Sequence, residues 1–467
     1  MERGSFGYLR STIPPISAPA WVSMVTGKNP AKTGVFDWIR MPTKNGKKPK
    51  IVYLNDVKEP KIWDFLGQEG MKSCIINLPL SYPPCELNGI MVSGIPGHIA
   101  GGKITYPTTL KEELDKVVGG YEVYPYTDLR IPGKEVEYAA EFERVLEKRT
   151  KAALYLMRNE QWDFFMVVFF VLDSVQHYFW KHMDRCHPSF DPKLSKKFGN
   201  VIRKFYMKVD KSIGELINAT VEDTNVIVVS DHGMGPQYGC FLMNNLLREK
   251  GLLILKRDLD GLSTLMRPRD KALKVGISMA KKFPVIKKLA VKILPFQWKE
   301  NFTLRGRVKI DSEKLLSAID WHRTRAYALG EAGGIFVRNK SDCWFVRNLL
   351  KKIKCPYGKR KCTVKVYEKH QIYNGPYIDI APDILCLIDG YNIKTDLTLS
   401  GELWSPPILS GYHTEYGLFI AAGPDIESVT SPQHYSIYDV LPTILMLFEM
   451  DIPSDLDGGP LRSLLRA

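Results

Sequence analysis

The pentapeptide DSVQH places a carboxylate, Asp173, four residues before an imidazole, His177. It directly follows the apolar run Phe164–Leu172, which we predict to be a strand. On a helix that begins there, the two side chains share one face and can reach one cation. The pattern is weak alone, because Asp is also a common helix N-cap. We expect the nearby His182 and His187 to lie on the surface.

A second polar segment, SDHGMG, closes the apolar run Asn225–Val229. Adjacent side chains of an extended strand point to opposite faces, so Asp231 and His232 converge on one site only where the backbone bends. Gly233 and Gly235 permit such a bend. A polar run is a costly way to end a buried strand, so we favour a functional interpretation.

Two further segments supply a hydroxyl and an imidazole. The run ISAPAWVSMVTG contains Ser17, and Pro19 suits the first turn of a helix that begins there. A serine at a helix N-terminus faces the positive end of the helix dipole and suits an anionic substrate, although Ser17 could also be only an N-cap. His413, in SGYHTEYG before the apolar run Leu418–Ala422, is informative only beside the other segments.

Together these segments supply ligands for two divalent metals. Mixed Asp and His ligands suit zinc, with manganese or iron as possible substitutes. Two such ions about 3.5–4 Å apart clamp the attacking and leaving oxygens of an in-line phosphoryl displacement. One set comprises Asp173, His177 and His413, and the other comprises Asp231, His232 and Ser17.

The order and context of these segments resemble the alkaline phosphatase superfamily. The resemblance is to its type I phosphodiesterase/nucleotide pyrophosphatase branch and the predicted phosphohydrolase–phosphomutase relatives. Four segments spread over most of the chain carry it, and their conjunction in this order is highly specific. They are SAPAWVSMVTG at 17–27, DSVQH at 173–177, SDHGMGP at 230–236 and GYHTEYGLFIAAGP at 411–424.

The resemblance implies a metal-dependent hydrolase of phosphodiester, pyrophosphate or phosphomonoester bonds that forms a phospho-serine intermediate. Its substrate would be a phosphorylated small molecule or a phosphodiester. A phosphomutase of the same superfamily shares the ligands. A catalytically impaired pseudoenzyme that binds anionic lipid or nucleic acid is the alternative from another class. In the implied roles the nucleophile is Ser17, one zinc is held by Asp173, His177 and His413, and the other by Asp231 and His232.

One part of the family pattern is absent. In the family, the metal beside the nucleophile also takes an Asp from the end of the first strand, upstream of the nucleophile. Only 16 residues precede Ser17, and Met1–Ile16 contains no Asp. We recognise no apolar strand there, so we expect the first strand to be missing and the chain to be a few tens of residues short of the working enzyme. As written, we expect impaired two-metal catalysis.

Further apolar runs alternate with helical periodicities along the chain. Ser73–Asn77 and Gly417–Ala421 are predicted strands, and Glu135–Arg158 and Lys197–Asn218 are predicted helices. Such alternation predicts an α/β fold with a mostly parallel sheet sandwiched by helices.

Basic residues are concentrated in one stretch. Lys and Arg number 65 against 51 Asp and Glu, which gives a formal net charge of +14. Residues 251–310 hold 15 basic and 4 acidic residues, so they carry +11 of that charge. We interpret them as part of an inserted cap with solvated lysines, and a contact with an anionic surface is the alternative. We expect a core in two parts, 1–240 and 371–467, around a cap or substrate region at 241–370.

The bulk composition, with 45% hydrophobic and 25% charged residues, excludes a disordered chain. The eight cysteines show no close repeated spacing. We expect Cys355 and Cys362 to be unrelated thiols rather than a pair, which favours a reducing compartment. No apolar run approaches the roughly 18 residues of a membrane span, and Met1–Arg10 is no signal peptide. These features predict a cytoplasmic protein without a transmembrane segment.

Overall fold

A computed structural model of the chain describes residues 4–40, 50–96, 102–125, 133–256, 309–310, 312–331, 333–356, 362–398, 401–429 and 431–466. Most of the basic stretch 251–310, which we expect to form a solvated cap or to contact an anionic surface, lies outside these residues.

The first strand of the structure, β1 (Gly4–Arg10), lies inside a four-stranded sheet of order β21–β1–β20–β8. β1 pairs in parallel with β21 (Gln433–Ser436) and antiparallel with β20 (Tyr416–Ala422). β20 in turn pairs antiparallel with β8 (Val226–Val229). Since β1 and β8 are both antiparallel to β20, they run in the same direction.

The expectation that no strand opens the chain is therefore wrong. The segment GSFGYLR is too polar and too rich in glycine to stand out as a strand, but it alternates in burial: Ser5, Gly7 and Leu9 are buried, and Tyr8 is exposed. A Cβ at Gly7 would lie 2.3 Å from the carbonyl oxygen of Gln433. Glycine thus allows the close approach of β21, which is the physical reason for the unusual composition.

A second four-stranded sheet has the order β6–β5–β4–β7. β4 (Ser73–Leu78) pairs in parallel with β5 (Gly89–Ser93) and with β7 (Phe164–Val167). The short β6 (Thr105–Tyr106) is antiparallel to β5. All six residues of β4 are buried, as expected for a strand covered on both faces.

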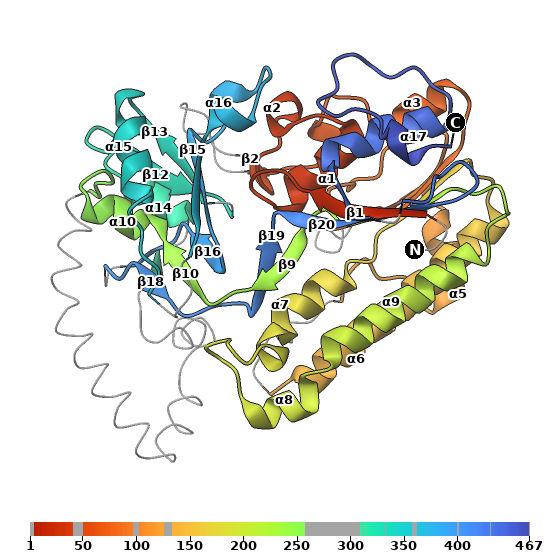
Figure 1. Cartoon of the computed structure of the whole chain (residues 1–467), viewed down its shortest axis with the longest axis horizontal. Coiled ribbons are helices and arrows are strands. Elements are labelled where there is room, and N and C mark those ends of the chain that lie inside the picture. The colour runs from red at the N-terminus through yellow and green to blue at the C-terminus, as the bar shows by residue number, and fades with distance from the viewer. Residues whose placement is uncertain are drawn as a thin grey trace.

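Helices lie on both sides of these two sheets (Figure 1). On one side α1 (Ser17–Thr26) contacts α17 (Val440–Leu447), which contacts α3 (Ile62–Gln68). The other side carries α5 (Leu110–Val118), α6 (Glu135–Asn159), α7 (Val171–Met183), α8 (Pro192–Phe198) and α9 (Val201–Ile217). α6 and α9 are the two predicted helices, with α8 separated from α9 by a turn.

A third, seven-stranded sheet lies beside this core (Figure 1). It has its own buried apolar cluster, which includes Phe241, Leu247 and Ile384. The order is β12 (Ala326–Leu329), β13 (Gly334–Val337), β15 (Ile384–Ile388), β16 (Tyr391–Lys394), β10 (Gly239–Leu242) and β18 (Trp404–Ser405), with β14 (Val364–Glu368) paired to β15; the helices are α10 (Met243–Glu249), α14 (Ser312–Ala318) and α15 (Ser341–Leu350).

The α/β class is confirmed, and the sheets are mixed. Parallel pairs join β4 to β5 and β7, β1 to β21, and β10 to β16, and the other pairs are antiparallel. Since the strands of the third sheet run from β10 to β18, this sheet continues past residue 370, and the division into core and cap stays a prediction. The remaining short elements are α2 (Pro30–Thr33), β2 (Ile39–Arg40), β3 (Lys50–Ile51), β9 (Gly233–Pro236), β11 (Lys309–Ile310), α16 (Lys369–Ile372), β17 (Leu397–Thr398) and β19 (Gly411–Thr414).

β7 and β8 each have one edge that no described strand pairs. Both strands are wholly apolar, FFMV and VIVV, yet all their residues are only half-buried. Phe164 and Met166 of β7 pack against the same core cluster as Ile227 and Val229 of β8. Apolar strands with unpaired edges are open to a further strand.

The structure bears on two predictions, one about the pairing of cysteines and one about the cellular compartment. Cys355 and Cys362 form a disulfide, so the prediction of unrelated thiols is wrong. Spacing alone could not show that the two Cα atoms lie 6.2 Å apart, within the range of a disulfide. A cytoplasmic location stays a prediction, and this disulfide weighs against it because thiols are kept reduced there.

The prediction that His182 and His187 lie on the surface is also wrong. Their exposed fractions are 1% and 3%. His187 accepts a hydrogen bond at Nδ1 from the Ser189 amide, and its Nε2 donates to the carbonyl of Gln237. His182 lies on the face of α7 that is covered by neighbouring aromatic rings. Both histidines stand in a polar stretch of the sequence, which does not show that neighbouring elements cover their side chains.

His182 packs beside Phe179 and Phe198, and neither of its ring nitrogens has a hydrogen-bond partner among the described residues. Burial lowers the pKa of His182 to about 4. Because the unfolded chain binds this proton near pH 6.5 and the folded protein does not, we expect the free energy of unfolding to fall by up to about 3 kcal/mol as the pH drops from 6.5 to 4. Urea unfolding across this range measures the effect.

His182→Leu is expected to flatten that pH dependence, because the variant has no imidazole to protonate on unfolding. The matched control is His322→Leu, which removes an exposed histidine and shows what the loss of any histidine does to the profile. An unaltered profile in His182→Leu would contradict the assignment.

Candidate active site

Four segments that are far apart in the sequence meet at the carboxyl ends of β7 and β8. They are the first turns of α7, the turn between β8 and β9, strand β19 and the first residue of α1. β19 pairs antiparallel with β9, which brings its histidine beside the turn (Figure 1). The structure thus brings together all six residues singled out in the sequence: Ser17, Asp173, His177, Asp231, His232 and His413.

Asp173 is the centre of this cluster. Its Oδ1 lies 3.2 Å from Nε2 of His177, 3.3 Å from Nε2 of His413 and 4.0 Å from Nε2 of His232. Asp173 is in the first turn of α7, because the helix begins at Val171, earlier than the predicted strand would allow. The predicted i,i+4 geometry with His177 is therefore present on a helix.

Each of the three imidazoles places its Nδ1 beside a backbone carbonyl oxygen. Nδ1 of His177 lies 2.7 Å from the carbonyl oxygen of Gly411, and Nδ1 of His413 lies 3.1 Å from that of Pro15. Nδ1 of His232 lies 3.0 Å from the carbonyl oxygen of Gly233. Because a carbonyl oxygen only accepts hydrogen bonds, each Nδ1 carries the proton and donates. Each Nε2 therefore presents a lone pair to the cluster in the neutral ring.

These lone pairs face one another. Nε2 of His177 and Nε2 of His413 are only 3.1 Å apart, and Oδ1 of Asp173 beside them is buried with no hydrogen-bond donor among the described residues. Acceptors at this separation repel unless a positive charge lies among them. The donor set, one carboxylate and neutral imidazoles tied back by backbone carbonyls, is the arrangement that transition-metal sites use.

The protonation of the cluster agrees with a cation site. Burial lowers the pKa of His413 to about 3, so its ring is neutral at physiological pH. Burial opposes ionisation of Asp173, but His177 and His413 hold the pKa of its carboxyl well below the usual range. Burial also lowers the pKa of His177, but Asp173 outweighs this and raises it.

Ser17 lies at the edge of the cluster and is 3% exposed. Its Oγ is 3.1 Å from Nε2 of His232. The alternative interpretation as a helix N-cap does not fit, because Ile16 occupies the N-cap position and Ser17 is the first residue of α1. The hydroxyl is thus directed to the cluster, at the positive end of a ten-residue helix.

Asp231 and His232 adjoin the serine. Oδ2 of Asp231 is 3.2 Å from Nε2 of His232 and is buried with no hydrogen-bond donor among the described residues. Burial raises the pKa of Asp231. The backbone at Asp231 is fixed by the Ser11 hydroxyl, which donates to its carbonyl oxygen over 2.5 Å. A second group of acceptors therefore faces Ser17, with fewer ligands than the first.

A family model for type I phosphodiesterase/nucleotide pyrophosphatase matches residues 1–390, which is most of the chain. The chain belongs to this family. The matched span includes the segments that hold Ser17, Asp173 and Asp231. The family predicted from the four segments is thereby confirmed. Membership supports a phosphoryl hydrolase of the phosphodiesterase/pyrophosphatase type.

Solved structures of the superfamily have a similar fold. Human ectonucleotide pyrophosphatase/phosphodiesterase 5 is 14% identical, with a TM-score of 0.50 over 100% of this chain and 92% of that one. Its inactive murine counterpart in complex with AMP is 15% identical, with a TM-score of 0.52 and the same coverage. Phosphonoacetate hydrolase from Sinorhizobium meliloti 1021, in complex with phosphonoacetate, is 14% identical, with a TM-score of 0.52 over 94% and 86% of the two chains.

Two further findings are negative. No curated protein matches the chain by sequence. Among the described helices, none has the length and apolar character that crossing a membrane requires.

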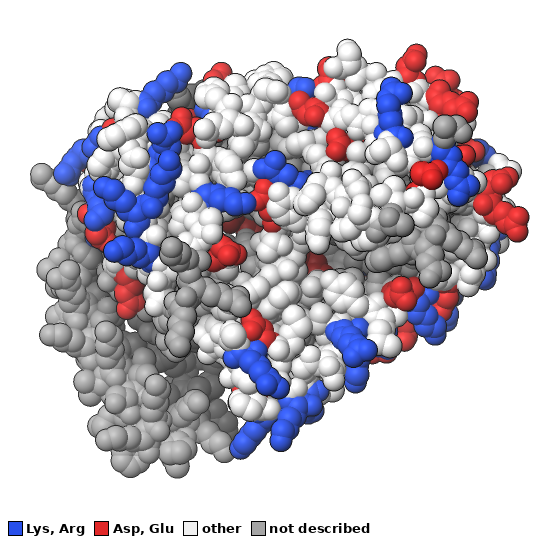
Figure 2. Space-filling view, in the orientation of Figure 1, with Lys and Arg blue, Asp and Glu red and all other residues white. Residues whose placement is uncertain are grey.

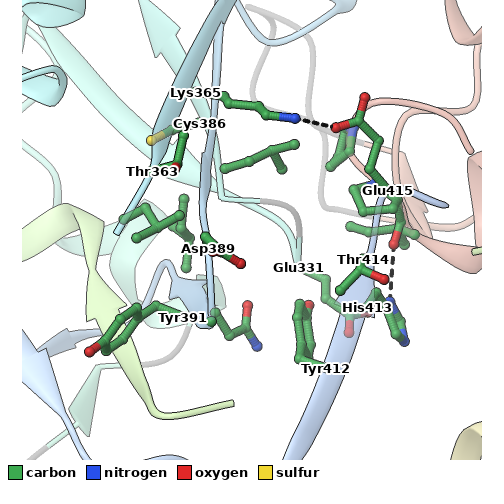
Figure 3. A pocket seen from close by; sticks show the side chains of 18 of the residues that line it. Glu331, Thr363, Lys365, Cys386, Asp389, Tyr391, Tyr412, His413, Thr414 and Glu415 are labelled. Carbon is green, nitrogen blue, oxygen red and sulfur yellow. Dashed lines mark hydrogen bonds and ion pairs between the residues drawn. The ribbon is translucent and has the colours of Figure 1, made fainter. Parts of the chain in front are cut away.

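A cavity of about 370 Å³ lies beside the cluster of this phosphodiesterase-family protein, between the core and the third sheet (Figure 3). Its wall includes Ile16, which precedes the serine, and His413. Figure 3 shows Glu331 and Tyr412 next to His413. The Tyr412 ring stacks on the His413 ring with centroids 4.8 Å apart. The cavity therefore adjoins the acceptor cluster through a shared histidine.

The cavity carries an excess of negative charge. Its charged lining residues are three carboxylates, Glu331, Asp389 and Glu415, and one ammonium, Lys365. The ammonium is already paired with Glu415, with Nζ 2.6 Å from Oε2. The unbalanced carboxylates favour a neutral or cationic group in this space over a second anion.

Sequence reasoning missed the residues that orient the cluster. The carbonyls of Pro15 and Gly411 have no side-chain signature, so only the fold shows them. Glu415 could have been predicted as a residue of the site, because it is the acidic residue in the segment GYHTEYG that contains His413. It accepts hydrogen bonds from Arg10 of β1 and Lys365 of β14, which hold its pKa below the usual range despite burial. It thereby ties the third sheet to the core next to His413.

Proposed function

We propose that this protein is a metal-dependent hydrolase of phosphodiester, pyrophosphate or phosphomonoester bonds, with Ser17 as the nucleophile. The observation that carries the proposal is the convergence of Nε2 of His177, His232 and His413 on the carboxylate of Asp173, while each Nδ1 lies beside a backbone carbonyl oxygen. A buried set of acceptors is stable only with a cation, and Ser17 lies next to it.

The donor types fit divalent cations. Asp173, His177 and His413 would hold one ion, and Asp231 and His232 would contribute to the second, beside Ser17. His232 also lies within reach of the first set, since its ligand atom is within 4.8 Å of those of Asp173 and His413. Nitrogen with carboxylate oxygen suits zinc, with manganese or iron as alternatives. When bound, such ions neutralise the phosphate charge and lower the pKa of a bound hydroxyl or water.

In the first step the Ser17 oxygen attacks phosphorus, a serine–phosphorus bond forms, and the bond to the leaving alcohol breaks. Ser17 loses its proton, and the leaving oxygen gains one. The position of Ser17 at the first turn of α1 places the phosphate oxygens near the helix N-terminus, where negative charge is stabilised. His232, 3.1 Å from the serine oxygen, holds the hydroxyl in place.

In the second step a water oxygen attacks the phospho-serine, and the bond from Ser17 to phosphorus breaks. The serine recovers its proton and the phosphoryl group leaves as a monoester, or as phosphate from a monoester substrate. The two steps together add one water across one ester bond. A phosphomutase would differ only here, by returning the phosphoryl group to another hydroxyl of the substrate.

The test is metal reconstitution followed by substrate profiling. The chain is stripped with a chelator, reloaded with zinc, manganese or ferrous iron, and assayed on bis-p-nitrophenyl phosphate, p-nitrophenyl phosphate and AMP. Phosphonoacetate is added because a structurally similar hydrolase binds it. We expect zinc to restore turnover, with bound metal counted by mass spectrometry.

Two results would count against the proposal. One bound equivalent or none, with no turnover of any substrate and salt-sensitive binding of lipid or RNA, would favour the pseudoenzyme. Turnover that moves the phosphoryl group between hydroxyls of a sugar phosphate without releasing phosphate would favour the phosphomutase.

The cavity beside His413 gives a prediction about leaving groups. Glu331→Gln removes one of its carboxylates, so we expect KM for a diester with an aminoalkyl leaving group to rise about 3- to 5-fold. KM for the same diester without the amine should not change. The matched control is Glu215→Gln on α9, which removes a carboxylate outside the cavity. Equal effects of Glu331→Gln on both esters would show that the cavity does not bind the leaving group.

A further inference from the structure

The helix α15 has a buried side that fixes it to the third sheet. Asp342, Val346 and Leu350 are buried, and the helix contacts β14 and β15. The only carboxylate of the helix is on this side, since Asp342 forms an ion pair with Arg325. The opposite side of α15 is therefore free of acidic residues.

That opposite side exposes two neighbouring aromatic rings. Trp344 is 66% exposed and Phe345 is 43% exposed, and Trp344 is the most exposed aromatic side chain among the described residues. Single exposed apolar residues are common on soluble proteins. Two large exposed rings at consecutive positions near the centre of a ten-residue helix indicate a contact surface.

Exposed lysines flank the two rings. Lys340 is the N-cap of α15, Lys351 is its C-cap and Lys352 is the next residue, so exposed lysines stand at both ends of the helix that carries the rings. None of them forms an ion pair with a described residue. Figure 2 shows Lys and Arg side chains gathered over the part of the molecule where Figure 1 labels α15. We call Lys340, Trp344, Phe345, Lys351 and Lys352 the α15 face.

This combination matches the chemistry of a membrane surface. Tryptophan and phenylalanine lie at the boundary between headgroups and acyl chains, and lysines beside them bind anionic headgroups. A single-stranded nucleic acid needs a basic groove with stacking rings along it. No residue of the α15 face lines the cavity beside His413 or the cavity lined by Arg10, Gln371 and Tyr438.

We propose that the α15 face docks on an anionic lipid surface, with Trp344 and Phe345 among the headgroups and the three lysines against their phosphates. Each lysine near such a surface contributes about 1 kcal/mol. Replacing all three is therefore expected to weaken vesicle binding about 100-fold. The proposal is independent of the phosphoryl chemistry, since none of these residues belongs to the metal cluster.

The test is cosedimentation of the full chain with vesicles of phosphatidylcholine alone and of a phosphatidylcholine–phosphatidylserine mixture. We expect binding to the anionic vesicles only. The triple variant Lys340→Gln, Lys351→Gln, Lys352→Gln should lose most of it, and Trp344→Ala with Phe345→Ala should lose about 10-fold. Circular dichroism of each variant checks that it folds.

The matched control is Tyr206→Ala with Met207→Ala, which removes a similarly exposed pair, 48% and 62% exposed, from α9. It should bind anionic vesicles like the unaltered chain. The proposal is overturned if the control loses as much binding as the aromatic variant, or if the lysine variant binds like the unaltered chain. Binding of a poly-uridine oligonucleotide that the same lysines support, without vesicle binding, would also overturn it in favour of a nucleic acid.

Discussion

Replacement of Ser17 by alanine is expected to reduce the turnover of a phosphodiester by at least about 10³-fold, while the number of bound metal ions stays unchanged. The serine oxygen is bonded to a side-chain acceptor of the cluster, 3.1 Å from His232 Nε2. The variant loses the atom that bonds to phosphorus but no carboxylate or imidazole. Turnover with added zinc and metal content by mass spectrometry separate the two effects.

The covalent intermediate gives a second readout of the same prediction. Acid quench of the unaltered chain during turnover should yield a phosphorylated peptide that contains Ser17, and the variant should yield none. Ser23→Ala is the matched control, because Ser23 is a buried serine of the same helix, six residues further on, and its hydroxyl has no hydrogen-bond partner among the described residues. Full activity of Ser17→Ala, or phosphate on another residue, would reject Ser17 as the nucleophile.

The sequence predicted the cluster because its residues lie where apolar strands end. Asp231 and His232 close β8, and a polar pair at that place is costly unless it has a function. The i,i+4 spacing of Asp173 and His177 likewise predicts a shared face on any helix. His413 carried no such local pattern, and its place before an apolar run became informative only beside the other segments.

The features that could not be predicted depend on contacts distant in sequence. The tautomers of the histidines are set by carbonyls of Pro15 and Gly411, which any residue could supply. The strand β1 lacks an apolar pattern because Gly7 must accommodate the backbone of β21. The burial of His182, in α7, depends on Phe198, an aromatic residue of the next helix, α8. In each case the local structure is set by a contact with a residue elsewhere in the sequence, so the residue itself carries no pattern that predicts it.

The unpaired edges of β7 and β8 support the second large expected effect. The carboxyl ends of both strands lead into the cluster, at Asp173 and Asp231. A strand that pairs with both in parallel would therefore also end at the cluster. If it ended in a carboxylate, that group would add a ligand on the side where Asp231 and His232 face Ser17.

We expect a chain extended before Met1 by such a strand, ending in Asp, to bind the second metal ion more tightly and to turn over a diester about 100-fold faster at limiting metal, because a second ion contributes several kcal/mol to the transition state. The added strand ends at the cluster, but β1 runs in the same direction as β8 and begins at the opposite end of the sheet. A crossover of at least a dozen residues, best made helical, must connect them.

The matched control carries Asn in place of the terminal Asp. Both extended chains should have a higher free energy of unfolding than the original, because the new strand pairs the open edges and covers the half-buried side chains of β7 and β8. Only the Asp version should gain metal and turnover, since a neutral amide is a poor ligand for zinc. Stabilisation without any difference in turnover between Asp and Asn would show that the edges accept a strand but that the second ion needs no further carboxylate. Absence of stabilisation in both would show that the edges of β7 and β8 do not accept the added strand.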